Sequence, residues 1–245
     1  MKSIRKLLVK LFGINTYLKI VSKIYILLVR NGFLKEKYPE IFYLKSIVKQ
    51  DFTCIDIGAN LGYYSYFMSK YAGKNGKLYS VEPIPMFAEI WKSNMKSSNS
   101  NHKLFQVALG GENKTVQMGI PERDGVLRHG LTKITSSAEE KYVSFFDVEM
   151  KIPDELFADL TKIDFIKCDV EGYESIVFDN FKKQIMRHKP LVQTELSGIE
   201  NRLHVVGLFK EMGYSVNVLE NDRLVPISES DIKLVDKDFY FIPKN

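Results

Sequence analysis

Phe165-Ile-Lys-Cys-Asp-Val-Glu-Gly-Tyr-Glu174 decides the fold, together with Cys54-Ile-Asp-Ile-Gly-Ala-Asn-Leu-Gly62 and Val81-Glu-Pro83. Each stretch is a short apolar run, typical of a buried strand, that ends abruptly in acidic and glycine residues. Parallel strands of an open α/β sheet bring their carboxyl ends to one edge, where such folds bind ligands. The three stretches therefore predict an active site of carboxylates and exposed backbone at one sheet edge.

Beyond Gln50, short apolar runs alternate with helix-like segments. Strands are expected at 52–57, 77–81, 103–109, 163–168, 190–196 and 214–219, and helices at 62–72, 86–96, 173–186 and 201–212. This alternation predicts a parallel sheet covered on both faces by crossover helices. The 245 residues and 45% apolar side chains suffice for one substantial core. We therefore expect one α/β domain over residues 51–245.

Two segments depart from this alternation. An insertion at about 111–150 contains Thr115–Ile120 and Tyr142–Glu149, which are typical of antiparallel ribbons around the loop 123–130. A long insertion at this place is expected to form a wall or lid on the acceptor side of the site. The aromatic run Asp238–Pro243 follows Leu219 too closely for a full crossover helix, so it is expected to be an antiparallel edge strand.

Residues 1–50 form a separate basic segment. They carry eleven Lys and Arg against two acidic residues, a net charge of +9, whereas the rest of the chain has a net charge of −4. Helices are expected at about 2–12, 16–30 and 38–49, with breaks at Gly13, Asn31-Gly32 and Pro39. A basic amphipathic leader suits peripheral contact with anionic lipid, although such a helical face is more often only solvated.

No segment is predicted to cross a membrane or to be a secretory leader. The apolar run Ile24–Val29 is bounded by Lys23 and Arg30, and it is much shorter than the roughly 20 apolar residues that a bilayer span needs. No small-residue cleavage site follows the first apolar stretch promptly. We therefore expect a cytoplasmic protein, with a peripheral position on the inner face of the membrane as the alternative that the basic leader allows.

The two cysteines, Cys54 and Cys168, both lie within apolar strand-like runs, so buried reduced thiols are expected. A metal ion could recruit Asp169, Glu171 and Glu195, but three carboxylates without fixed spacing are weak grounds for a metal site. No metal is therefore predicted.

The glycine-rich stretch suits a ligand that carries a ribose and an ammonium group. It follows a strand and opens a helix, but it lacks the full G-x-G-x-x-G spacing of dinucleotide sites. Gly58 lets the backbone turn tightly and approach a ligand closely, and Asp56 is placed to receive an ammonium group, directly or through water. Glu82 ends the second strand, 24 residues after Gly58, where it can accept hydrogen bonds from both ribose hydroxyls. The order and spacing of these residues favour a bound ligand over a plain capped turn.

These motifs resemble those of the FkbM family of S-adenosylmethionine-dependent methyltransferases. The similarity spans about residues 50–245 and is carried by Ile55-Asp-Ile-Gly-Ala-Asn-Leu-Gly62, Val81-Glu-Pro83 with Asn94 downstream, Val107-Ala-Leu-Gly110, Ile163-Asp-Phe-Ile-Lys-Cys-Asp-Val-Glu-Gly-Tyr-Glu174, Lys189-Pro190 leading to Glu195, and Phe239-Tyr-Phe-Ile-Pro243. The run Ile-Lys-Cys-Asp-Val-Glu-Gly-x-Glu is the most specific of these, since the glycine motif with Asn60 occurs in several methyltransferase groups. The helical leader and the 111–150 insertion match poorly.

The resemblance implies a Rossmann-like class I methyltransferase fold, with a seven-stranded, mostly parallel sheet whose last strand is antiparallel. It implies that S-adenosylmethionine lies over the turn, with its ribose on Glu82. The cofactor-binding residues would then be Asp56, Gly58, Ala59, Asn60, Gly62, Glu82, Gln106, Val107, Ala108 and Asp169, of which Gln106 to Ala108 border the adenine. Members of the family methylate hydroxyl groups, commonly on saccharides, glycolipids and related glycans, so such an acceptor is expected here.

Four residues are expected to carry the chemistry: Asp169, Lys167, Glu195 and Glu171. Methyl transfer from a sulfonium to a hydroxyl needs alignment and a base for the hydroxyl proton. Lys167 lies two residues before Asp169 on the same side of its strand. Since an unpaired buried ammonium is costly, Lys167 is expected to pair with Asp169 or Glu195. The three side chains would converge beside the transferred methyl, or form an ion pair that only shapes the pocket.

Several assignments stay open at this point. Glu171 is favoured for the site and Glu174 for the helix that follows. His129 and His204 could reach the site, although surface positions are favoured for both. Methylation of an RNA ribose at its 2′ oxygen would also suit Lys167, Asp169 and Glu195, but the net charge of −4 beyond residue 50 disfavours nucleic acid. A non-catalytic domain that binds the cofactor and docks to a membrane or partner through the basic leader is the third interpretation.

Overall fold

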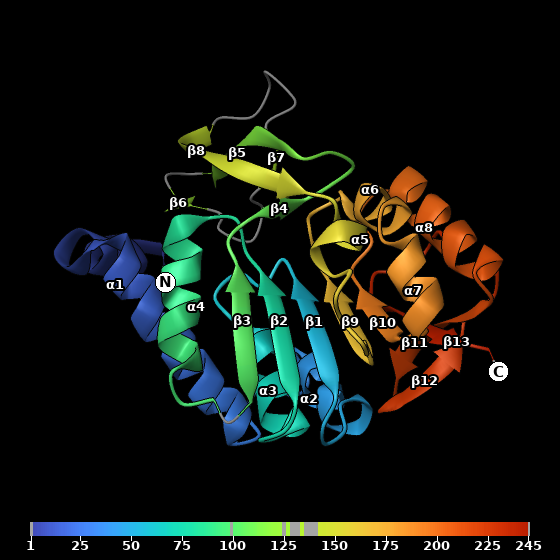
Figure 1. Ribbon diagram of the computed structural model, residues 1–245. Coiled ribbons are helices and arrows are strands. Elements are labelled where there is room, and N and C mark those ends of the chain that lie inside the picture. Colours follow the sequence, from blue (N-terminus) through green and yellow to red (C-terminus); the bar gives the residue numbers. More distant parts are fainter. Residues whose placement is uncertain (1, 99, 124–125, 128–132, 135–141, 245) are drawn as a thin grey trace.

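Figure 1 shows the computed structural model of the chain, which describes all residues except 1, 99, 124–125, 128–132, 135–141 and 245. Its main sheet has eight strands in the order β12-β11-β13-β10-β9-β1-β2-β3. Their bounds are β1 Thr53–Ile57, β2 Lys77–Val81, β3 Asn101–Phe105, β9 Phe165–Cys168, β10 Leu191–Thr194, β11 Tyr214–Glu220, β12 Arg223–Pro226 and β13 Phe239–Pro243. The expected mostly parallel α/β sheet is confirmed, with β12 as an additional hairpin strand paired to β11.

The predicted edge position of the last strand is wrong. β13 is antiparallel as expected, but it lies between β10 and β11 and pairs with both. Phe239, Tyr240 and Phe241 are fully buried, because helices cover both faces of the sheet at this strand. A run that is apolar on both faces is more stable inside a sheet than at its edge, so β11 and β12 close the outside instead.

Helices pack on both faces of the sheet and bury its two faces in separate cores. The helices are α3 Tyr63–Ala72, α4 Pro85–Met95, α5 Pro153–Leu156, α6 Glu174–Asp179, α7 Lys182–His188 and α8 Ile199–Glu211. One core contains Phe178, Phe181 and Phe209 from α6, α8 and their connections, and the other contains Phe67 and Trp91 from α3 and α4. The carboxyl ends of the parallel strands form the upper edge of the sheet in Figure 1.

The insertion forms a second, smaller sheet above that edge. It contains β4 Ala108–Leu109, β5 Lys114–Arg123, β6 Val126–Leu127, β7 Lys133–Ile134 and β8 Tyr142–Lys151. β5 and β8 pair in antiparallel fashion, as the sequence predicts, with an irregularity between Ile120 and Pro121. Figure 1 shows this sheet lying across the ends of β1, β2 and β3. Met118 and Ile120 turn inward from β5 and pack with Ile84, Phe87 and Ile90.

The basic leader folds against the α/β domain. Helix α1 spans Lys2–Arg30 with non-helical backbone at Gly13, and α2 spans Pro39–Ile47, close to the predicted segments. Leu18, Ser22 and Ile26 are buried. The side chain of Asn94 in α4 donates hydrogen bonds to the Leu61 carbonyl at 2.8 Å and to the Ser22 hydroxyl at 2.9 Å, which joins α1 to the glycine turn.

One expectation about the leader needs correction. Leu8–Arg30 is long and apolar enough to cross a membrane by length and composition alone, since the helix continues well beyond the short run Ile24–Val29. This is a weak indication, because core helices and N-terminal signal sequences meet the same criteria. Its outer side exposes apolar residues, namely Leu11, Phe12, Ile20, Ile24 and Leu27. Membrane contact through residues 1–50, and the cytoplasmic location itself, stay predictions.

Candidate active site

The turn after β1 brings bare backbone to the sheet edge. Gly58 has φ of 78° and Asn60 has φ of 47°, so the chain reverses through left-handed conformations that glycine and asparagine tolerate best. The N–H groups of Gly58 and Ala59 both donate to the Val81 carbonyl at 3.0 Å. A Cβ on Gly58 would lie 1.9 Å from the carbonyl oxygen of Asp169. Only glycine therefore allows the turn to lie directly against the end of β9.

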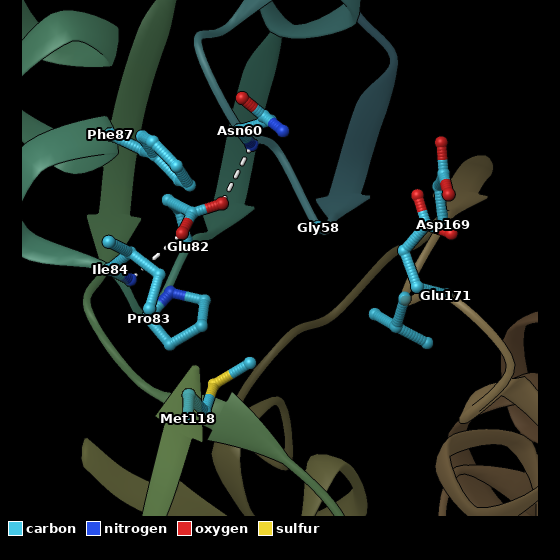
Figure 2. Close-up of a pocket in the computed structure, with 10 residues that line it drawn as sticks. Gly58, Asn60, Glu82, Pro83, Ile84, Phe87, Met118, Asp169 and Glu171 are labelled. Carbon is cyan, nitrogen blue, oxygen red and sulfur yellow. Dashed lines mark hydrogen bonds between the residues drawn. The ribbon is translucent and has the colours of Figure 1, made fainter. Parts of the chain in front are cut away.

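Glu82 fixes the turn from the neighbouring strand. Its carboxylate accepts the N–H of Asn60 and the N–H of Ile84, each at 2.8 Å, as Figure 2 shows. Burial raises the pKa of Glu82 to about 7, although the two backbone donors oppose this shift. A carboxylate offers about four lone-pair positions. Two acceptor positions therefore remain for the vicinal hydroxyls of a ribose.

Three residues of the glycine motif support the turn from behind. Asp56 turns toward α3 and accepts a hydrogen bond from Ser65, and burial raises its pKa to about 6. A Cβ on Gly62 would lie 2.9 Å from the Trp91 ring, and Ala59 is buried. None of the three lines the cavities at the sheet edge. The Asp56 side chain therefore does not reach either cavity, and its expected direct contact with the ammonium group of a ligand is not seen.

Two cavities open at the turn. The glycine-turn cavity, of about 170 Å³, is lined by Gly58, Asn60, Glu82, Pro83, Ile84, Phe87, Met118, Asp169, Val170 and Glu171. In Figure 2, Glu82 lies on one side of Gly58, and Asp169 and Glu171 lie on the other. The Val107 cavity, of about 380 Å³, is lined by Ile57, Gly58, Val81, Pro83, Val107, Ala108, Leu109, Met118, Val170, Glu171, Gly172 and Tyr173. Five lining residues are common to both cavities, so the two are adjacent.

The adenine-bordering stretch is only partly where the sequence places it. Val107 and Ala108 line the Val107 cavity, but Gln106 is exposed and lines neither cavity. Sequence reasoning did not single out Phe87, Met118 or Tyr173 as lining residues. Met118 comes from the insertion strand β5, so the insertion forms part of the wall of both cavities. The alternation of apolar residues along β5 was the only available signal for an inward-facing side chain.

A row of buried polar side chains crosses the main sheet below this edge. Residues of neighbouring strands that are aligned in register share one face, which here places Ser80, Asp56, Lys167, Gln193, Tyr240 and Asn217 in one line. Lys167 is the cation in this row, and its side chain is 3% exposed. The row faces α3, where the Lys167 ammonium lies 5.1 Å from the centroid of the Tyr64 ring.

Lys167 holds two carboxylates together. Its ammonium nitrogen lies 3.7 Å from an Asp169 oxygen and 3.5 Å from an Asp238 oxygen, and Gln193 donates to the same Asp238 oxygen at 2.7 Å. Burial opposes the charge, but Asp238, Asp169 and Glu195 outweigh it and raise the pKa of Lys167 well above its usual range. Lys167 therefore stays protonated and cannot act as a base. Its ion pair with Asp169 was expected, whereas Asp238 was missed.

The remaining acidic residues differ in their roles. Glu174 is buried and accepts the N–H groups of Val170 and Gly172 and an amide N–H of Asn201, so it holds the turn before α6. Glu171 lines both cavities with φ of 53°, and burial together with repulsion from Asp169 raises its pKa to about 8. Partial desolvation and the same neighbour raise the pKa of Glu195 to about 7, but Glu195 lines neither cavity.

The histidines lie away from this edge where the structure describes them. His204 pairs with Asp179 at 2.7 Å on the surface, and His129 lies outside the described residues. Within the described part of the chain, no group of three or more His, Cys, Asp or Glu side chains has the arrangement of a metal site. Cys54 and Cys168 are free and buried, as the sequence predicts.

A comparison with protein families identifies the family to which these motifs belong. The model of the methyltransferase FkbM domain matches residues 56–216, which span the glycine turn, Glu82 and the Lys167–Asp169 strand. The chain belongs to the FkbM methyltransferase family. It is therefore an S-adenosylmethionine-dependent methyltransferase, as the motifs around Asp56 and Asp169 indicate.

Two solved structures are similar to this FkbM methyltransferase at low sequence identity. An S-adenosylmethionine-dependent O-methyltransferase from Thermotoga maritima matches with a TM-score of 0.49 and 14% identity, covering 87% of this chain and 66% of that chain. The methyltransferase FkbM from Methylobacillus flagellatus matches with a TM-score of 0.46 and 15% identity, covering 82% of this chain and 50% of that chain. No curated protein matches the sequence.

The site fits the methyl donor on two structural grounds. Gly58 lines both cavities at the turn, and Glu82 retains acceptor positions for two hydroxyls. Glu82 would hold the ribose, and Val107 and Ala108 would border the adenine in the larger cavity. When bound, S-adenosylmethionine supplies an electrophilic methyl group on a positively charged sulfur.

Glu82→Gln is expected to weaken binding of S-adenosylhomocysteine by about 10-fold or more, since a hydrogen bond to a charged group contributes roughly 1.5–3 kcal/mol. The amide would present N–H donors to the N–H of Asn60 or Ile84 and lose an acceptor for the ribose. Titration calorimetry measures the change. Glu89→Gln is the matched control, because Glu89 lies on the exposed side of α4, where it pairs with Lys92. Equal affinity of folded Glu82→Gln and wild-type protein would contradict this placement of the ribose.

Proposed function

We propose that this enzyme is an O-methyltransferase that moves a methyl group from S-adenosylmethionine to a hydroxyl of a saccharide, glycolipid or related glycan. The observation that supports it is the position of Asp169. Asp169 lines the glycine-turn cavity, and its carboxylate forms an ion pair with Lys167. Lys167 also pairs with Asp238. A carboxylate that is fixed by a buried cation at the edge of the donor site is suited to accept the proton of an acceptor hydroxyl.

The other three polar residues support Asp169 in different ways. Lys167 is a positioning residue, because its charge is fixed and its ammonium pairs with two carboxylates and lies over the Tyr64 ring. Glu171 contributes negative potential on the cofactor side. Glu195 does so on the opposite side, where the acceptor would enter. In the overall reaction the methyl group moves from sulfur to oxygen, and the hydroxyl proton passes to Asp169.

The pH dependence of binding tests the electrostatic part of this proposal. A positive sulfur in the donor cavity favours the ionised form of Glu171, which lines that cavity, and lowers its pKa from about 8 in the free protein. Binding of S-adenosylmethionine then releases protons, so its affinity should rise with pH and level off above about 8. S-adenosylhomocysteine has a neutral sulfur, so the ratio of the two affinities isolates the effect.

Calorimetric titrations of both ligands between pH 6 and pH 9 provide the measurement. Glu171→Gln should flatten the dependence of the ratio on pH, since it removes the titrating carboxylate that lines the donor cavity. A ratio that does not change with pH in the wild-type protein would show that Glu171 does not face the sulfur.

Transfer of a labelled methyl group to a broad glycan panel tests the function itself. Product formation on a saccharide hydroxyl is the expected result. Tight binding of S-adenosylhomocysteine with transfer only to amines, or to no glycan in a broad panel, would count against the proposal.

A further inference from the structure

A third cavity lies at the same sheet edge, beyond Asp169. This Glu195 cavity, of about 390 Å³, is lined by Glu40, the loop 195–198, Arg202 and the segment 236–238. Its volume lies within the range of small-molecule sites, about 300–1,000 Å³. It shares no lining residue with the glycine-turn and Val107 cavities. Those two lie over the ends of β1, β2 and β3, whereas this one lies where β10 ends and β13 begins.

The ion pair of Lys167 separates the cavities and connects them electrostatically. Asp169 lines the glycine-turn cavity and Asp238 lines the Glu195 cavity, and both lie within 4 Å of the same ammonium. A group that is held in the Glu195 cavity is therefore adjacent to the proposed base. The order along the edge is the donor cavities, then Asp169 with Lys167, then the Glu195 cavity.

Three polar side chains in the wall of this cavity, those of Arg202, Lys237 and Asp238, already have partners. The Arg202 guanidinium donates to the carbonyls of Leu196, Ile232 and Lys233, so it holds the loops in place. Asp238 accepts from Gln193 and Lys167. Among the described residues, the Glu40 side chain meets only its own backbone N–H, and the Glu195 side chain has no hydrogen-bond partner. The exposed side chains of Ser197 and Asp236 also have no partner among these residues. Two carboxylates from α2 and the β10–α8 loop are thus available to a ligand.

The chemistry of the wall selects among ligands. It contains four acidic side chains against Arg202 and Lys237, so an anionic ligand such as a phosphate is disfavoured. It contains no aromatic side chain on which a nucleobase could stack, which disfavours RNA. Leu196 is its only large apolar residue. A ring that carries several neutral hydroxyl groups satisfies free carboxylate acceptors without burying a charge of its own.

We propose that the Glu195 cavity binds the acceptor as an uncharged sugar ring, whose hydroxyl groups donate hydrogen bonds to Glu40 and Glu195. This inference rests on the proposed methyl transfer to a glycan, and it assigns the substrate-binding side chains of that reaction. It also gives the leader a role in the site, since Glu40 precedes the stretch that matches the FkbM domain.

Saturation-transfer NMR with methyl α-D-glucopyranoside, mannopyranoside and galactopyranoside tests the assignment on full-length protein saturated with S-adenosylhomocysteine. At least one glycoside is expected to bind the wild-type protein, and Glu40→Gln and Glu195→Gln are each expected to weaken that binding about 10-fold, as the loss of a charge-assisted hydrogen bond would. Glu36→Gln is the matched control, because Glu36 lies just before α2 and is exposed. Cyclohexanol and spermidine serve as apolar and cationic comparison ligands.

The outcomes separate this inference from the function on which it rests. Glycoside binding or methylation that is unchanged in both folded variants would overturn the assignment of the cavity and leave the O-methyltransferase proposal standing. Binding of spermidine or cyclohexanol in place of every glycoside would overturn the sugar assignment. Failure of the wild-type protein to bind S-adenosylhomocysteine would instead contradict the proposed function itself.

Discussion

Replacing Asp169 with asparagine is expected to lower the rate of methyl transfer by about 10²- to 10⁴-fold, the usual contribution of a positioned general base. Asparagine keeps the size of the side chain but cannot accept the hydroxyl proton. The affinity for S-adenosylhomocysteine should change little, because Glu82 and the backbone at Gly58 are untouched. Single-turnover kinetics with a glycan acceptor and titration calorimetry give the two measurements.

Glu195→Gln provides the comparison for Asp169→Asn. Glu195 lies in the neighbouring cavity rather than in the donor cavity, so its replacement should raise KM for the acceptor and change kcat less. A larger loss of kcat in Glu195→Gln than in Asp169→Asn would reverse the assignment and make Glu195 the base.

Replacing Lys167 with methionine is expected to reduce the free energy of unfolding by about 3–5 kcal/mol, the usual effect of removing one partner from a buried ion pair. The Lys167 side chain is 3% exposed, and Asp238, which is 12% exposed, would lose the cation that compensates its charge. For a chain of this size the change corresponds to a drop of roughly 10 °C in Tm. Urea unfolding followed by circular dichroism measures it.

Lys162→Met is the matched control for this effect. Lys162 lies 3.1 Å from Asp164 at the start of the same strand region, but its side chain is 55% exposed, so the expected loss is below about 1 kcal/mol. The double variant Lys167→Met with Asp238→Asn should recover part of the stability, since it removes the unpaired carboxylate. Equal losses in Lys162→Met and Lys167→Met would show that the buried pair contributes nothing beyond a surface pair.

The sequence predicts the fold well because its signals are local. Apolar runs that end in glycine or acid mark β1, β2 and β9 within one or two residues, and the ribbon pattern of the insertion identifies β5 and β8. The position of β13 in the sheet could not be predicted from local signals. Its aromatic residues indicate a strand, but whether β11 lies outside it depends on pairing between segments that are far apart in the chain, and local propensity does not decide that.

In the candidate site, too, local signals predict single residues but not contacts between distant segments. Gly58 and Glu82 were identified correctly as neighbours at the sheet edge, since each ends its own strand. Asp56 precedes the same turn but faces α3, because side chains alternate along a strand and its position belongs to the buried face. Asp238 could not be assigned to Lys167, since their contact requires β13 to lie beside β10.

The sequence by itself determined that this chain is an α/β methyltransferase of the FkbM family, because glycine turns and acidic strand ends are encoded within a few neighbouring residues. Only the tertiary structure decided which carboxylates meet. Strand order and register bring Asp56, Lys167 and Gln193 into one row and place Asp238 beside Lys167. Packing of the leader brings Glu40 to the same cavity as Glu195. The reason is that packing of both sheet faces fixes strand order and register, and packing joins residues that are distant in sequence.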